Sequence, residues 1–169
     1  MFFKGDIIIT DPCYIIPQNA RSRSSDKGDH WDLCEYGGRL DKLGIKTFIT
    51  RDTIYGDWSC TTFNSDTKEP IGKFCADAGL VSVMLLSEVL AYNPNFDYHT
   101  ERPWTTTLIK DFEGDISFDV SKDKCSDKCS DFSLDEQCSS YHSGNCGTEE
   151  SVKVVGRGNI NFRTSQTGF

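Results

Sequence analysis

The 169-residue chain has no long apolar run; the longest begins at Leu80 and is interrupted by Ser82 and Ser87. A membrane-spanning helix needs about 20 consecutive apolar residues, so we expect no transmembrane segment. The apolar residues 1–3 are followed at once by Lys4, which leaves no room for the hydrophobic region of a secretory signal peptide. We therefore expect a cytoplasmic protein.

The chain also has few basic residues: 18 Lys and Arg stand against 26 Asp and Glu, a formal net charge of −8. An acidic surface repels the phosphate backbone of nucleic acids. No dense run of basic residues offsets this charge, and the nearest approach to one is Arg21 and Arg23 in a serine-rich loop. A nucleic acid polymer is therefore not an expected partner.

The motifs of common enzymes are missing as well. No Ser/His/Asp arrangement and no glycine-rich phosphate loop stands out, and the chain contains only three histidines, at positions 30, 99 and 142. The short Gly156-Arg157-Gly158 is better explained by a hairpin turn than by a phosphate site. The sequence therefore favours a non-enzymatic protein.

The sequence does contain many short strand signals. Runs of β-branched and aromatic residues alternate with Gly, Pro, Asn and Asp, which is typical of strands joined by turns. The expected strands are 7–10, 45–49, 58–63, 73–86, 104–109, 116–120, 152–155 and 159–163. One short helix is expected at 88–92, capped by Ser87 and ended by Asn93-Pro94.

Seven or eight strands with one or two short helices predict a mainly β fold, or an α+β fold with few helices. We expect a single domain over residues 1–169, built as an antiparallel sandwich or a small barrel. Residues 121–150 are rich in Ser, Asp, Lys and Cys, and poor in apolar residues, so they are interpreted as a Cys-rich insertion between two core strands.

Two of the expected strands carry an aspartate and a cysteine two residues apart. Asp11 and Cys13 share one face at the end of the first strand, and Cys75 and Asp77 share one face of the long strand. If these strands pair antiparallel, Asp11 lies opposite Asp77, or each aspartate lies opposite the other strand's cysteine. Two facing carboxylates would suit acid–base chemistry or a divalent cation.

A third polar motif, Tyr55-Gly56-Asp57-Trp58, stands at a strand entry, where Trp58 is positioned to stack on a planar ligand. Gly79 would allow a ligand or another backbone to approach closely. The candidate ligand-binding residues are Asp11, Cys13, Tyr14, Asp57, Trp58, Cys75, Asp77 and Gly79.

Each of these candidates also has a purely structural explanation. An aspartate before proline is a common turn former. A buried carboxylate can accept hydrogen bonds from backbone amides. Tryptophan and free cysteine most often belong to the core.

The motifs Asp-Pro-Cys-Tyr (11–14), Tyr-Gly-Asp-Trp (55–58) and Ala-Asp-Ala-Gly (76–79), with the C-terminal Gly-Arg-Gly-Asn-Ile-Asn-Phe, resemble a group of small uncharacterised phage and bacterial proteins. The resemblance covers most of the chain except 17–30 and 121–150. It implies a phage-type, cytoplasmic setting and no established chemistry. Small phage proteins of this kind are often inhibitors of host defence, and some trap nucleotide signals.

Five residues that could bind a metal, four cysteines and one histidine, lie in the insertion within 22 residues: Cys125, Cys129, Cys138, His142 and Cys146. Zinc takes four such ligands tetrahedrally, and a short polar segment gains order from a metal. The spacing is not a repeated Cys-x-x-Cys pair, so disulfides and free thiols remain alternatives. If zinc binds, four cysteines would close its coordination sphere and make the site structural.

The leading functional hypothesis is a phage-type binding protein that traps a small polar ligand, a nucleotide signal or a host protein. A nucleotide would need Arg157, Arg163, Lys73 or backbone amides to offset the acidic residues. The alternatives are a hydrolase that uses Asp11 and Asp77 with a divalent cation, and an interaction module organised by structural zinc.

Overall fold

The computed structural model describes residues 1–17, 40–52, 58–77, 79–98, 105–122 and 150–167. The strands are β1 (Phe2–Thr10), β2 (Phe48–Asp52), β3 (Trp58–Asn64), β4 (Pro70–Ala76), β5 (Leu80–Leu85), β6 (Thr106–Lys122), β7 (Glu150–Gly158) and β8 (Phe162–Thr167). The helices are the 3-10 helices η1 (Pro12–Tyr14) and η2 (Leu40–Leu43), and the α-helix α2 (Leu86–Tyr92).

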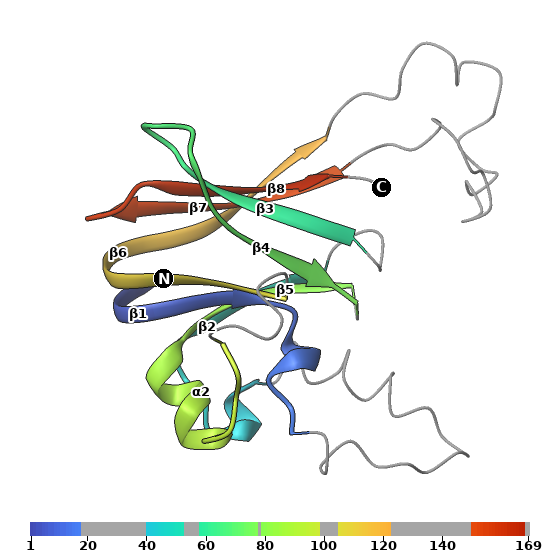
Figure 1. The fold of residues 1–169 in the computed structure, drawn as a ribbon, viewed down its shortest axis with the longest axis vertical. Helices are drawn as coiled ribbons and strands as arrows, with labels where there is room; N and C mark the ends of the chain where they lie inside the picture. Colours follow the sequence, from blue (N-terminus) through green and yellow to red (C-terminus); the bar gives the residue numbers. More distant parts are fainter. Residues whose placement is uncertain (18–39, 53–57, 78, 99–104, 123–149, 168–169) are drawn as a thin grey trace, which may run out of the picture.

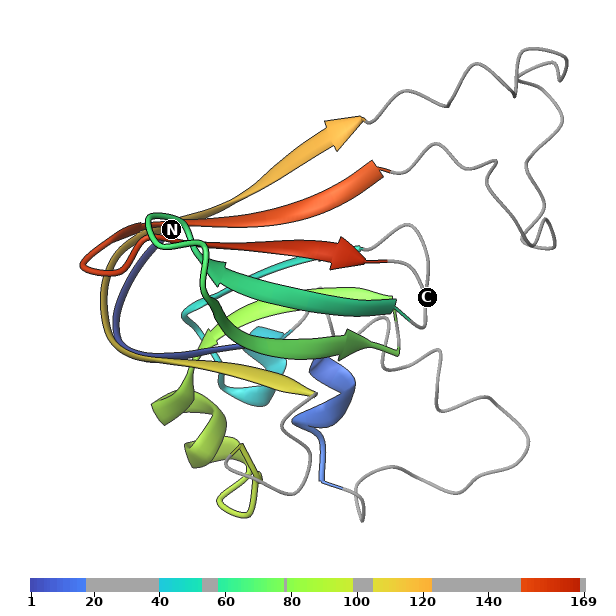
Figure 2. The ribbon, with the colours of Figure 1, turned by 45° about the horizontal axis from the view of Figure 1, so that its top comes forward.

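All eight described strands belong to one antiparallel sheet in the order β2-β5-β1-β6-β7-β8-β3-β4. This sheet folds over on itself, as Figures 1 and 2 show. One layer contains β2, β5, β1 and the first half of β6, and the other contains the second half of β6, β7, β8, β3 and β4. The mainly β, sandwich-like fold predicted from the strand signals is confirmed, and the described sheet does not close into a barrel.

The long strand β6 connects the two layers. Its first half pairs with β1 and its second half with β7, and Gly114 lies where the pairing changes partner. Gly114 has φ +157°, and a Cβ there would stand 1.9 Å from the carbonyl oxygen of Arg157. Glycine is required because the paired strands β6 and β7 approach each other too closely at this point for a side chain.

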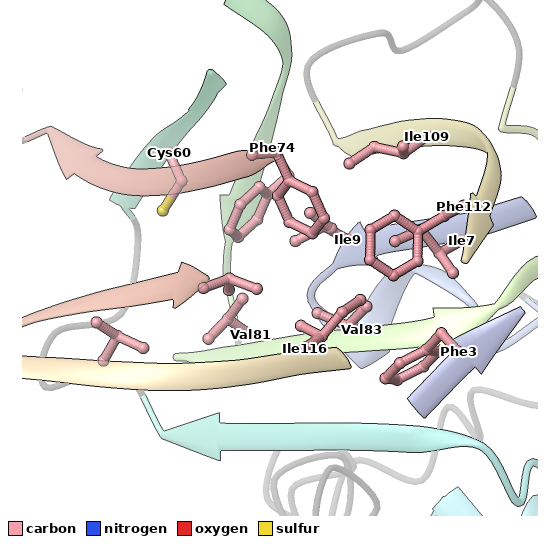
Figure 3. Close-up of a cluster of buried hydrophobic side chains, with 13 residues drawn as sticks. Phe3, Ile7, Ile9, Cys60, Phe74, Val81, Val83, Ile109, Phe112 and Ile116 are labelled. Carbon is pink, nitrogen blue, oxygen red and sulfur yellow. The ribbon is translucent and has the colours of Figure 1, made fainter. Parts of the chain in front are cut away.

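Apolar side chains fill the space between the layers and form the inner core (Figure 3). Its buried members are Phe3, Ile7, Ile9, Cys60, Phe74, Val81, Val83, Ile109, Phe112, Ile116, Val152, Val154 and Phe162. Phe112 and Phe162 come from β6 and β8 and meet edge to face, with ring centroids 5.6 Å apart.

A second apolar cluster covers the opposite face of β1 and β5. Because strand side chains alternate, Ile8 points away from the inner core that Ile7 and Ile9 fill. This outer cluster contains Ile8, Cys13, Ile15, Ile16, Leu40, Ile45, Met84, Leu86, Val89 and Phe96. Helices α2, η1 and η2 supply part of it, and Figure 2 shows α2 and η1 outside the layer that contains β1.

Beside the outer cluster, the same face carries a row of hydroxyl side chains across four strands. The strand register aligns Thr50, Ser82, Thr10 and Thr106. The hydroxyls of Thr50 and Ser82 are 2.7 Å apart, and Thr106 donates to Thr10 at 3.2 Å. This row marks the end of β1, immediately before Asp11.

Several strand predictions are wrong in detail. The strand expected at 45–49 is β2 at Phe48–Asp52, and the one expected at 159–163 is β8 at Phe162–Thr167. Gly156, Arg157 and Gly158, expected as a hairpin turn, belong to β7 and pair with β6. Residues 73–86 form two strands, because β4 and β5 belong to different layers and the chain turns between them. Residues 106–109 and 116–120, from the two strands expected at 104–109 and 116–120, belong to the single strand β6, which continues through Gly114.

The short helix is confirmed, but it begins at Leu86 and its N-cap residue is Leu85 instead of Ser87. Within the described residues, none of the helices has the length and apolar character needed to cross a membrane.

Candidate functional site

Two of the three sequence motifs meet where the chain passes from β4 to β5. The Asp-Pro-Cys-Tyr motif forms the cap and body of η1, and the Ala-Asp-Ala-Gly motif contains the turn between the two strands. Hydrogen bonds join the motifs at two points, through Asp11 and through Tyr14. We call the group Asp11, Tyr14, Cys75, Asp77 and Gly79 the corner site.

Asp11 is the buried, structural member of the corner site. Its side chain is fully buried. Oδ1 accepts a hydrogen bond from the amide of Cys13 at 3.0 Å, which caps η1, and Oδ2 accepts from the amide of Leu80 at 3.3 Å. Both carboxylate oxygens therefore accept hydrogen bonds from backbone amides, and together they fix η1 against the start of β5.

Gly79 provides the backbone conformation of the turn. Its amide donates to the carbonyl of Ala76 at 3.3 Å, and its φ of +74° lies in the left-handed region that glycine adopts without strain. The close approach that the sequence suggested at Gly79 is thus a tight turn of the chain itself.

Tyr14 and Asp77 form the surface part of the corner site. The Tyr14 hydroxyl donates to Oδ2 of Asp77, across 63 positions in the sequence. Tyr14 is half-buried, whereas Asp77 is exposed. The pKa of Tyr14 is raised, first by burial and then by the hydrogen bond and the charge of Asp77. Tyr14 therefore remains a neutral hydrogen-bond donor at neutral pH.

Two cysteines near the corner site, Cys60 and Cys75, have thiol pKa values above the usual range. Burial and, to a smaller extent, Asp77 raise the pKa of the partly exposed Cys75. Burial and Cys75 raise the pKa of Cys60, in the inner core, to about 12. Cys13 is buried in the outer cluster. Because the thiolate is the reactive form of cysteine, Cys60 and Cys75 lack the environment of a nucleophile.

The third motif reaches the corner site through its last residue. In the β3–β4 register, Trp58 pairs with Ala76, which immediately precedes Asp77. The pairing places the backbone of Trp58 beside the corner site. Asp57 lies outside the described residues, as do Tyr55 and Gly56.

The predicted pairing of the strands that carry Asp11 and Asp77 is correct only in part. β1 and β5 do pair antiparallel, but Thr10 lies opposite Ser82, which directs Asp11 toward Leu80 instead of Asp77. Asp77 is not in a strand, because the chain bends after Ala76. In the observed register, the two carboxylates instead have separate partners and different burial.

The predicted zinc ligands at positions 125, 129, 138, 142 and 146 lie outside the described residues, between the end of β6 and the start of β7. Within the part of the chain that the structure describes, no three His, Cys, Asp or Glu side chains are grouped as metal ligands. Structural zinc in the 121–150 segment stays a prediction.

Sequence reasoning included Tyr14 and Asp77 among the candidates but missed the bond between them. It also missed the amide of Leu80 as the partner of Asp11. The available signal was Gly79, since a glycine after an aspartate inside an apolar run indicates a turn as readily as a strand. Reading a turn at 77–79 would have divided the run into two strands.

Comparison of the chain with protein-family models, with curated proteins and with solved structures finds no match.

Proposed function

We propose that this chain is a non-enzymatic binding protein and that the surface around Tyr14 and Asp77 contacts its ligand. The observation that carries the proposal is the hydrogen bond between these two side chains, which come from distant segments and meet on an exposed turn. Asp11 holds η1 against β5, so the two surface groups are presented by a fixed backbone. Such preorganised polar groups are typical of ligand sites.

The chemistry of the corner site favours binding over catalysis. Asp11 is buried and uses its two oxygens on backbone amides, which leaves it poorly placed as a general base. The raised pKa values of Cys75 and Tyr14 keep both groups protonated at neutral pH. Neither group is therefore an activated nucleophile.

The biological setting of the proposal comes from the resemblance to small phage and bacterial proteins. In that setting the protein would inhibit a host defence by trapping a small polar ligand, a nucleotide signal or a host protein. The compact β sandwich with one preorganised surface site is compatible with that role.

Native mass spectrometry of freshly purified protein tests the proposal. The mass of the native protein is compared with its denatured mass for the wild type, Asp77→Asn and Tyr14→Phe. We expect extra mass on the wild type, from a small molecule or a second polypeptide, and at least a tenfold lower occupancy on both variants. Asp119→Asn is the matched control, because Asp119 is an exposed aspartate of β6 that is not part of the corner site.

Equal occupancy on the wild type and the two corner variants would place the ligand elsewhere and refute the site. Turnover of the captured molecule, lost in Asp77→Asn while the protein stays folded, would refute the non-enzymatic assignment.

A further inference from the structure

Backbone amides at the corner site are already bound to an internal anion. Phosphates and carboxylate ligands are commonly held by free amides at turns and helix starts. Here the amides of Cys13 and Leu80 donate to the two oxygens of Asp11, and the amide of Gly79 donates to Ala76. Three groups that an anionic ligand would need are thus used within the protein.

The side chains of the corner site have the opposite preference. Asp77 is exposed, and the Tyr14 hydroxyl occupies one of the roughly four lone-pair positions of its carboxylate. Remaining lone pairs of an exposed carboxylate favour a positively charged hydrogen-bond donor. The charge of Asp77 acts on Tyr14 as a negative neighbour.

Among the described residues, no Lys or Arg forms an ion pair with Asp77. Arg51 is exposed on β2 and pairs with Val81, four positions after Asp77. Lys73 is exposed on β4, three positions before Ala76, or about 10 Å along the strand. Arg163 pairs with Phe63, at the far end of β3 from Trp58, which is about 17 Å along the strand. The one described ion pair, Lys4–Glu113, involves neither Asp77 nor Tyr14.

We propose that the corner site binds a cationic group, an amine or a guanidinium, through the Asp77 carboxylate beside the Tyr14 hydroxyl. This inference rests on the proposed binding function and names the class of its ligand. The sequence had suggested a nucleotide, whose phosphate is an anion. The inference here names a cationic hydrogen-bond donor instead. A guanidinium fits best, because its planar fork can donate to a carboxylate in two parallel bonds.

The test is a titration of the ¹⁵N-labelled full-length chain with agmatine, a guanidinium amine, and separately with AMP, followed by amide NMR shifts. We expect agmatine to shift the amides of Asp77, Gly79 and Leu80 saturably, with a dissociation constant of about 1 mM. Asp77→Asn is expected to weaken this binding at least tenfold. Asp119→Asn is expected to leave it unchanged.

The cation has two possible sources, a free small molecule or a Lys or Arg side chain of a protein. Acetyl-Gly-Arg-Gly-amide and acetyl-Gly-Glu-Gly-amide distinguish them in the same titration. Tighter binding of the arginine peptide than of agmatine indicates a protein side chain, and the reverse indicates a small molecule. The glutamate peptide is the control of opposite charge and should not bind.

A second measurement uses Cys75 as a reporter of the local charge. The rates at which cationic and anionic methanethiosulfonate reagents modify Cys75 are followed by peptide mass spectrometry and divided by their rates with free cysteine. We expect the cationic reagent to be favoured about fivefold, because Asp77 lies close to the thiol. Asp77→Asn should reduce that preference toward unity.

Binding of AMP at these amides, or no saturable shift with agmatine and the arginine peptide, would overturn the inference. The proposed function fails separately, in the native mass experiment. If an anionic molecule co-purifies with the wild type and is lost from Asp77→Asn, the binding function stands and the assigned ligand class is wrong.

Discussion

Asp11 shows how one buried carboxylate can organise a local structure without being a reactive group. Its two oxygens reach an amide within η1 and an amide at the start of β5. Hydrogen bonds to a charged acceptor are stronger than neutral ones, and a buried amide left without a partner is costly. Asp11 therefore sets the relative position of the two motifs that build the corner site.

Replacing Asp11 by Asn tests this role. The amide group of Asn would present N–H donors to one of the two backbone amides, so we expect the free energy of unfolding to fall by about 2 kcal/mol. Urea unfolding followed by tryptophan fluorescence measures the change. Asp119→Asn, on the surface of β6, should change stability by less than about 0.5 kcal/mol. If Asp11→Asn lowers the free energy of unfolding no more than Asp119→Asn does, the structural role of Asp11 is contradicted.

The thiol of Cys60 makes stability depend on pH in the alkaline range. Burial raises its pKa from 9.0 to about 12, so the folded chain keeps a proton that the unfolded chain releases above pH 9. This contribution is complete below pH 9 and is lost as the pH rises toward 12. Between about pH 8 and pH 10, Cys60 should lower the free energy of unfolding by about 1.4 kcal/mol.

The measurement is urea unfolding of the wild type and Cys60→Ala at both pH values. The alanine variant loses packing in the inner core at each pH, so only its difference between the two pH values is compared. We expect that difference to be smaller than in the wild type by about 1.4 kcal/mol. Equal pH dependence of the two proteins would show that the Cys60 thiol is not protected by burial.

The close approach of β7 to Gly114 in strand β6 makes a prediction about the pair of strands. A methyl group at Gly114 would stand 1.9 Å from the Arg157 carbonyl and 2.6 Å from the Cα of Gly158. Backbone atoms of a paired strand cannot move aside, so Gly114→Ala should destabilise the protein by about 3 kcal/mol or more.

Gly44→Ala is the matched control for that substitution. Gly44 also has a positive φ, +84°, but no atom lies within 4 Å of its added Cβ. Gly44→Ala should lower the free energy of unfolding by about 1 kcal/mol, which is the backbone strain alone. If thermal unfolding shows equal losses for both variants, close packing of β6 and β7 is not the reason for glycine at position 114.

The β6–β7 pair permits a clean removal of the Cys-rich segment. Lys122 and Glu150 are partners in the strand register, so the ends to be joined already face each other. An Asn-Gly turn in place of residues 123–149 suits a two-residue hairpin loop. We expect this variant to keep the β-sheet circular dichroism spectrum and cooperative unfolding of the parent protein.

Metal analysis of the same two proteins tests the zinc prediction. Structural zinc held by Cys125, Cys129, Cys138, His142 and Cys146 predicts about one zinc per full-length chain and none in the Asn-Gly variant. Absence of zinc from the full-length protein purified without chelator would leave disulfides and free thiols as the alternatives.

The molecule as a whole is a folded-over sheet with apolar clusters on two sides. The inner core joins the layers, and the outer cluster attaches α2, η1 and η2 to one of them. The corner site lies where the chain leaves β4 in one layer and enters β5 in the other. Its geometry therefore depends on packing of the layers as well as on its own hydrogen bonds.

Most of the strands and the antiparallel sandwich class follow from local patterns. Ile7, Ile8 and Ile9 predict a strand because β-branched side chains favour extended backbone. The exact register does not follow, because β5 is buried on both faces and has no alternation to fix it. The turn at Asp77 and Gly79 does not follow from the pattern alone, because a glycine after an aspartate fits a turn or a strand.

The sequence by itself determined most of the strands and the short helix, since propensity and turn chemistry act over a few residues, and it identified the three polar motifs. Only the tertiary structure decided which of their side chains meet. Asp11 turned inward to backbone amides, whereas Asp77 reached the surface beside Tyr14. The physical reason is that these partners lie more than 60 positions apart, and their contact depends on how the sheet folds over on itself.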